Sequence, residues 1–157
     1  MGAFEQGVMR ILYIDVDSLR ADHLGCYGYH RNTSPNIDAL AEDGRHFANY
    51  YASDVPCNPS RTGLFLSRFG IHTGVTNHGG HNADPRRYGR SRGFNYPPQY
   101  KSWMSVLAEN GIHTASVSPF PSRHDSWQVL EGIVEFHDPR DSHAHARDLY
   151  PYAAEWL

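Results

Sequence analysis

The alternation of apolar and polar residues predicts several short strands. Residues 9–16 (MRILYIDV) are mostly β-branched, aliphatic or aromatic, which is typical of a strand buried on both faces of a parallel sheet. Residues 46–52, 112–118 and 132–136 predict three further strands. Because helical segments separate these strands, the pattern favours an α/β sandwich with a mainly parallel sheet.

Helix signals lie between the strands. Three helices are predicted, over residues 33–44, 102–111 and 146–157. In the first, Thr33 or Ser34 caps the start. Pro35 suits the first helical position, and Gly44 ends the helix. Residues 84–100, by contrast, are polar and contain four arginines. They predict either a solvated loop or a surface that attracts an anionic substrate.

Residues 56–61 (PCNPSR) combine a cysteine with helix-start signals. Pro59 and Ser60 suit a first helical turn, so Cys57 is expected just before or at a helix N-terminus. Unpaired N–H groups and the helix dipole favour negative charge there. Arg61 adds a permanent guanidinium to the same face. The pattern indicates an oxyanion site beside a reactive side chain; the alternative is a buried thiol that opens an ordinary helix.

Two carboxylates lie where the first predicted strand ends. Open α/β sheets bind ligands at the carboxyl ends of their strands. Asp15 and Asp17 share one side of the strand because side chains alternate with a period of two. Their oxygens suit Ca²⁺ or Mg²⁺. The alternatives are that Asp17 caps the next turn and that Asp15 has a structural role.

Composition narrows the function classes. The 157 residues have room for one domain with a core, and the net charge of −3 offers no general case for nucleic-acid binding. No apolar run is long enough to span a membrane, and residues 1–10 lack the apolar core of a signal peptide. The two cysteines, Cys26 and Cys57, do not form a disulfide framework. The expectation is a cytoplasmic protein without nucleic-acid or membrane partners, in which Cys26 is a packed thiol.

Three consecutive motifs resemble one family. Residues 57–61 (CNPSR) resemble the core of the type I sulfatase signature. Residues 17–28 (DSLRADHLGCYG) resemble the family's metal-binding segment, and residues 33–51 resemble the segment that follows it. The resemblance therefore runs without a break from residue 11 to residue 61.

Two positions depart from the family pattern. The signature expects a small residue at Asn58, and it expects a Thr-Gly pair where this chain has Leu66 and Ser67. The enzyme that matures sulfatases reads this neighbourhood. The resemblance therefore implies maturation of Cys57 by a formylglycine-generating or equivalent enzyme, within a motif that is not fully standard.

The resemblance implies an alkaline-phosphatase-like fold, a three-layer sandwich, and a sulfuric ester hydrolase. In sulfatases the signature cysteine is oxidised to formylglycine, whose hydrate attacks the sulfur of a sulfate ester. Collapse of the hydrate to the aldehyde then expels sulfate, which splits one difficult step into two. For this chain Cys57 would be the precursor. The implied substrate is a sulfated small molecule or carbohydrate.

The resemblance also implies a divalent cation, Ca²⁺ or alternatively Mg²⁺ or Mn²⁺. Asp17 aligns with the family's first metal ligand, and Ser18 stands where a second aspartate is common. Asp15 is expected to supply the missing carboxylate. The group derived from Cys57 completes the metal ligands expected in this chain. Arg61 and the cation would neutralise the sulfuryl oxygens.

Histidines complete the implied site. His78 and His81 are candidates for the catalytic histidine near the nucleophile, against the alternative of loop packing. Many sulfatases grip the sulfate with a Lys and a His after the strand that residues 112–118 predict. The nearest basic pair here is Arg123 and His124, a candidate for substrate binding, and His124 is also a candidate for proton transfer.

The length of the chain bears on whether it is a whole enzyme or a part of one. Sulfatases are usually much longer, so we expect residues 1–157 to be an N-terminal portion of a sulfatase catalytic domain whose downstream metal ligands are absent. Such a portion is expected to be inactive alone. A phosphonate or phosphate monoester hydrolase of the same superfamily is a second interpretation. A truncated, non-catalytic product is a third.

Overall fold

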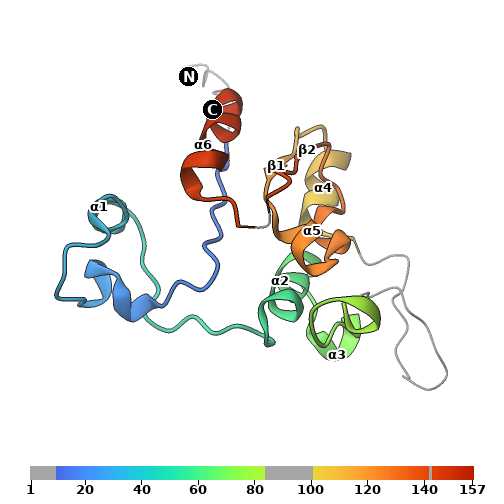
Figure 1. Ribbon diagram of the computed structural model, residues 1–157, viewed down its shortest axis with the longest axis horizontal. Coiled ribbons are helices and arrows are strands. Elements are labelled where there is room, and N and C mark those ends of the chain that lie inside the picture. The colour runs from blue at the N-terminus through green and yellow to red at the C-terminus, as the bar shows by residue number, and fades with distance from the viewer. Residues whose placement is uncertain (1–9, 84–100, 142) are drawn as a thin grey trace, which may run out of the picture. The chain divides into compact units, whose positions relative to one another are not determined.

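The computed structural model describes residues 10–83, 101–141 and 143–157 (Figure 1). The chain divides into two compact units, residues 1–51 and residues 52–157.

The described residues of the N-terminal unit, 10–51, contain three short helices. They are the 3-10 helices η1 (Ala21–His23) and η2 (Gly25–Tyr27) and the α-helix α1 (Pro35–Asp43). Ser34 is the N-cap residue of α1, Pro35 occupies its first turn and Gly44 is its C-cap. The predicted helix is therefore confirmed, with Pro35 and Gly44 at its ends, but the Ser34 hydroxyl bonds to the Asp38 carboxylate and makes no capping hydrogen bond.

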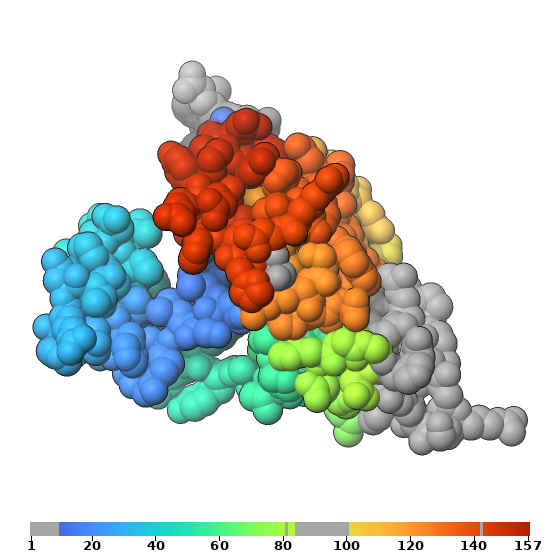
Figure 2. Space-filling view, in the orientation of Figure 1, coloured from blue at the N-terminus to red at the C-terminus, as the bar shows by residue number. Residues whose placement is uncertain are grey.

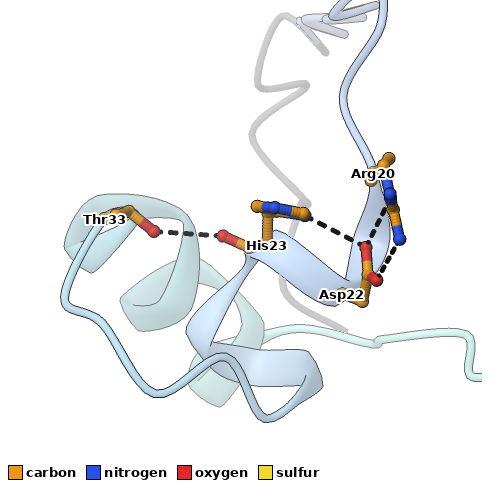
Figure 3. A network of polar contacts seen from close by, with 4 residues as sticks. All are labelled: Arg20, Asp22, His23 and Thr33. Atoms are coloured by element: carbon orange, nitrogen blue, oxygen red, sulfur yellow. Dashed lines mark hydrogen bonds and ion pairs between the residues drawn. The ribbon is translucent and has the colours of Figure 1, made fainter.

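A polar network precedes α1 (Figure 3). Arg20 binds Asp22 through two hydrogen bonds, of 3.0 and 2.6 Å, and Asp22 also lies 3.1 Å from the ring of His23. The Arg20 guanidinium lowers the pKa of the Asp22 carboxyl. The Thr33 hydroxyl donates to the backbone oxygen of His23 at 3.0 Å, which ties the start of α1 back to η1. The ion pair of Arg20 and Asp22 is exposed and therefore adds little stability, so the bond from Thr33 is the contact that joins η1 to the start of α1.

Two predicted strands are wrong for this unit. The described part of residues 9–16 and all of residues 46–51 are irregular, and Ile11 and Ile14 are 66% and 68% exposed. A strand is defined by hydrogen bonds to a neighbouring strand. Residues 10–51 contain no second strand with which either segment pairs. The apolar pattern alone is therefore not sufficient to form one here.

The C-terminal unit contains the remaining elements. They are α2 (Cys57–Leu66), α3 (Gly70–Thr73), η3 (Gly80–Asn82), α4 (Trp103–Glu109), β1 (Ala115–Val117), α5 (Phe120–His124), η4 (Trp127–Leu130), β2 (Glu135–His137) and α6 (Ala146–Trp156). The helices predicted over residues 102–111 and 146–157 are confirmed as α4 and α6. The strand predicted over 112–118 is confirmed as the shorter β1, and the strand predicted over 132–136 is confirmed as β2, which begins at Glu135 and extends one residue further, to His137.

Strands β1 and β2 form a parallel pair, with Ala115 opposite Glu135 and Val117 opposite His137. The connection between them carries α5 and η4, as a parallel crossover requires. Helix α6 packs on β1. The ring of Tyr152 in α6 stacks on His137 of β2 with centroids 3.4 Å apart.

The core of this unit lies between α2, α5 and η4. Its buried apolar side chains include Leu66, Val75, Phe120 and Val129. In the space-filling view, the green and lime segment of α2, α3 and the following loop lies against the orange segment of α5 and η4 (Figure 2). The loop after α3 is therefore packed against two helical segments rather than extended into solvent.

Helix α4 is held at its N-terminal turn. Phe65 of α2 stacks on Trp103 with centroids 5.6 Å apart, and Ser102 caps the helix by accepting from the N–H of Ser105 at 2.9 Å. Gly132 has φ +84°, and a Cβ there would collide with the backbone of Ser105. Only glycine therefore allows this approach of the loop to the helix.

The predicted α/β fold class is confirmed in part. The described residues combine helices with a two-stranded parallel sheet, so the parallel strand arrangement is present. The predicted three-layer sandwich is not formed by the described residues, 10–83, 101–141 and 143–157.

None of the helices in these ranges has the length and apolar character needed to cross a bilayer.

Candidate active site

Cys57 is the first residue of α2, as predicted, and Pro56 is the N-cap with extended backbone. The N–H of Ser60 bonds to the oxygen of Pro56 at 3.1 Å, which closes the first turn. Cys57 is half-buried. N–H groups of a first turn have no partner within their helix, so the position favours a negative charge.

His78 lies beside the thiol. Its Nε2 is 2.9 Å from Cys57 Sγ, within hydrogen-bond distance, and the ring tautomer decides which group donates. The two residues are separated by a full helix, the turn α3 and a loop. A thiol next to an imidazole is a standard arrangement for activating a nucleophile.

The loop that carries His78 is attached on both sides. The Asn58 side chain donates from Nδ2 to the backbone oxygen of Asn77 at 3.0 Å. The N–H of Gly79 donates to the oxygen of His124 at 3.2 Å. Gly79 has φ +64°, a conformation that glycine adopts without strain. His78 is thus held between α2 and α5.

His124 closes the other side of His78. It is the last residue of α5, and its ring centroid lies 4.3 Å from that of His78. The ring of Phe120 lies 4.6 Å from that of His124. The structure therefore places two of the predicted site histidines, His78 and His124, side by side, and His78 is the one that lies next to Cys57.

Arg61 lies one helical turn after Cys57, so the two residues share a face of α2. Its guanidinium carbon is 3.9 Å from the centroid of the Phe120 ring, a cation–π contact. Because that ring also contacts His124, Phe120 links the arginine to the histidine pair. Cationic, imidazole and thiol groups thus occur within one small part of the C-terminal unit.

Other predicted residues occupy different positions. Arg123 is exposed in the last turn of α5. His81 belongs to η3, and its side chain is outside the described part of the structure. The basic segment of residues 84–100 is also outside it. The expectation that this segment attracts an anionic substrate therefore stays a prediction.

Asp15 and Asp17 are exposed residues of the N-terminal unit, just before Ser18, which has φ +59°. Their oxygens have the right chemistry for a hard cation, but two carboxylates do not fill the six to eight positions of calcium. No group of three or more His, Cys, Asp or Glu side chains that would hold a metal gathers within the described ranges. Joint ligation by Asp15, Asp17 and Cys57 stays a prediction.

Cys26 has a different environment from Cys57. Its N–H donates to Asp38 Oδ1 at 2.8 Å, and the Ser34 hydroxyl lies 3.0 Å from each oxygen of the same carboxylate. Partial burial and the neighbouring carboxylate raise the pKa of the Cys26 thiol. The hydrogen bond from the Cys26 N–H lowers the pKa of Asp38. The pair is consistent with the structural role expected for Cys26.

Sequence reasoning missed one group beside the site. Asn58, Thr62 and Gln128 are buried polar residues that bond to one another under the first turns of α2. The only signal was Asn58 itself, a polar residue where a small one was expected. Gln128 lies far away in the sequence, within an apolar run that gives no sign of the contact.

Comparison with known proteins identifies the family. The Sulfatase family model matches residues 10–153, nearly the whole chain. The chain therefore belongs to the sulfatase family, whose fold is alkaline-phosphatase-like. No solved structure matches the chain significantly.

Three human relatives illustrate the similarity. Iduronate 2-sulfatase is 29% identical over 91% of this chain and 27% of the relative. Arylsulfatase D is 30% identical over 68% of this chain and 18% of the relative, and Arylsulfatase A is 38% identical over 41% and 13%. The chain thus spans roughly a quarter or less of the length of these relatives.

Proposed function

We propose that this chain supplies the nucleophile of a sulfuric ester hydrolase, and that Cys57 is the precursor of that nucleophile. The observation that carries the proposal is the 2.9 Å approach of His78 Nε2 to Cys57 Sγ at the first turn of α2. Membership of the sulfatase family supports it. Both residues belong to one compact unit, residues 52–157.

The side chains of this chain have distinct tasks in the proposal. Formylglycine derived from Cys57 would supply a hydrated aldehyde as the nucleophile in place of a thiol. His78, at hydrogen-bond distance, accepts or returns a proton at the atom that replaces Sγ. Arg61, on the same face of α2, offers donors to the sulfuryl oxygens. The ring of His124 restricts the position of His78.

Asp17 and Asp15 would contribute oxygen ligands to a divalent cation. Such an ion, when bound, neutralises sulfuryl oxygens as a Lewis acid. Carboxylate oxygens are suitable ligands for calcium, magnesium and manganese. Because two carboxylates leave most of the coordination shell open, the remaining ligands would come from other parts of the site.

The names of the relatives suggest the substrate class. They include arylsulfatases, Iduronate 2-sulfatase and an N-acetylglucosamine-6-O-sulfatase of Bacteroides thetaiotaomicron. We propose a sulfated carbohydrate or small aromatic ester as the substrate, and a formylglycine-generating enzyme as the maturation partner. Nothing in the described geometry favours a phosphate or phosphonate ester over a sulfate ester.

The test is a comparison of ester hydrolysis by the complete protein, produced together with a formylglycine-generating enzyme. An aryl sulfate and the matching aryl phosphate are offered with calcium present. We expect sulfate release to exceed phosphate release, and Cys57→Ala to lower sulfate release by at least about a thousandfold. Preferential phosphate release, or equal activity of Cys57→Ala, would refute the proposal.

A further inference from the structure

A buried hydrogen-bond network joins α2 to η4. The Gln128 amide nitrogen lies 3.1 Å from Asn58 Oδ1, 2.9 Å from Thr62 Oγ1 and 3.0 Å from the backbone oxygen of Ala83, and its two N–H groups are shared among these three acceptors. Asn58 and Thr62 are fully buried, and Gln128 is nearly so. Polar side chains in such a position are costly unless they are paired.

Two backbone carbonyls fix the orientation of both amides. The oxygen of Asn77 only accepts, so the end of Asn58 that faces it at 3.0 Å must be the NH₂ group. The Oδ1 of Asn58 then faces Gln128, which must present its own NH₂ group. The oxygen of Ala83 requires the same orientation. The network therefore has one consistent arrangement.

This arrangement connects the two reacting positions. Asn58 follows Cys57 directly, and its side chain holds the residue directly before His78. Gln128 holds Asn58 in the orientation that makes this bond possible. On the other side of His78, the N–H of Gly79 bonds to the oxygen of His124 at 3.2 Å. The Thr62 hydroxyl also donates to Asn58 Oδ1, at 3.3 Å, so it helps Gln128 to orient Asn58.

We infer that Asn58 and Gln128 are positioning residues, which hold His78 against the residue 57 side chain. This inference rests on the proposed role of Cys57 and His78 in sulfate ester hydrolysis. It gives Asn58 a task at the position where the sulfatase signature expects a small residue. A small side chain at position 58 would not reach the oxygen of Asn77. In this chain, therefore, the Asn58 amide is what holds the loop that carries His78.

The test separates positioning from core stability. Asn58→Ala removes the bond to Asn77, and Gln128→Met removes the orienting amide while it nearly preserves volume. Thr114→Val is the matched control, since it removes a buried hydroxyl of the same compact unit that bonds to the backbone oxygen of Gly132 and lies outside the network of Asn58 and Gln128. Melting temperatures of the complete proteins show how much stability each variant loses.

The first readout needs no enzymatic activity. The complete protein is produced without a maturation enzyme, and the rate at which iodoacetamide alkylates Cys57 at pH 7 is measured by peptide mass spectrometry. An imidazole partner favours the thiolate, so His78→Ala is expected to slow the reaction about tenfold. Asn58→Ala and Gln128→Met should slow it by a similar factor. Thr114→Val should stay within about twofold of the wild type.

The second readout is kinetic and uses matured protein. With rates divided by formylglycine content, Asn58→Ala and Gln128→Met are expected to lower kcat with little change in KM, because they displace a proton-transfer group. Wild-type alkylation rates in both variants, or no effect of His78→Ala on alkylation, would overturn the inference. Slowed alkylation in a protein that cleaves no sulfate ester would refute the proposed function and leave the positioning role standing.

Discussion

Cys57 Sγ and His78 Nε2 lie 2.9 Å apart, although a helix, a turn and a loop separate the two residues in the chain. The start of α2 fixes the position of the thiol. Hydrogen bonds from α2 and α5 to the loop that carries His78 fix the position of the imidazole. The pair is thus a product of tertiary packing. The predictions below test what this contact does.

Replacing His78 should impair turnover more than binding. His78→Ala removes the group placed for proton transfer, so kcat of the matured protein should fall by about 10²- to 10⁴-fold with little change in KM. Sulfate release from an aryl sulfate, divided by formylglycine content, measures the effect. His72→Ala, an exposed histidine of α3, is the control and should behave like the wild type. Equal losses in the two variants would show that the contact with Cys57 has no chemical role.

Arg61 should not be replaceable by lysine. Arg61→Lys keeps the charge but loses the planar fork that binds an oxyanion and stacks on Phe120. We expect kcat/KM for an aryl sulfate to fall by about 10- to 100-fold. Arg147→Lys, at an exposed position of α6, should leave kcat/KM unchanged. Wild-type kcat/KM in Arg61→Lys would exclude a fork-like contact with the substrate.

The two thiols should differ in reactivity. Partial burial and Asp38 raise the pKa of Cys26, which lowers its thiolate fraction at neutral pH, whereas Cys57 has an imidazole beside it. In unmatured protein at pH 7, iodoacetamide should alkylate Cys57 at least about ten times faster than Cys26. Asp38→Asn should speed the reaction of Cys26 and leave that of Cys57 alone. Faster alkylation of Cys26 in the wild type would contradict the described environments.

Acid should loosen the turn around Cys26. The Cys26 N–H and the Ser34 hydroxyl hold the pKa of Asp38 below its ordinary value of 3.8. A carboxyl whose pKa is lower in the folded state stabilises that state above its unfolded pKa, and this stabilisation is lost as pH falls through the folded pKa. Hydrogen exchange of residues 25–38 should therefore become less protected below about pH 4. Asp38→Asn, compared at each pH, should show a smaller loss; identical pH profiles would refute this role of Asp38.

The helices were predictable because their signals are local. Pro35 and Gly44 mark the ends of α1, and Gly111 follows α4, without reference to distant residues. The strands expected over residues 9–16 and 46–52 required hydrogen-bonded neighbours. No local pattern supplies such neighbours, so an apolar run is weaker evidence for a strand than a cap is for a helix.

The motif residues of the site were predictable from the sequence, and the residues that tertiary packing brings to them were not. The cysteine and arginine of residues 57–61 follow from a short motif, and their placement on one face of α2 follows from helical periodicity. The choice of His78 among several loop histidines depends on contacts from Asn58 and His124, which the sequence does not reveal. Gln128 was missed altogether, because a glutamine in an apolar run carries no mark of its distant partner.

The central claim is that Cys57 becomes the nucleophile of a sulfatase. It is tested most directly by the mass of the peptide that contains residue 57, from the complete protein produced with a formylglycine-generating enzyme. Replacement of –CH₂SH by –CHO should lower that mass by about 18 Da, and aryl sulfate cleavage should rise in proportion to the converted fraction. A peptide that keeps the full thiol mass while the protein cleaves aryl sulfates would contradict the account.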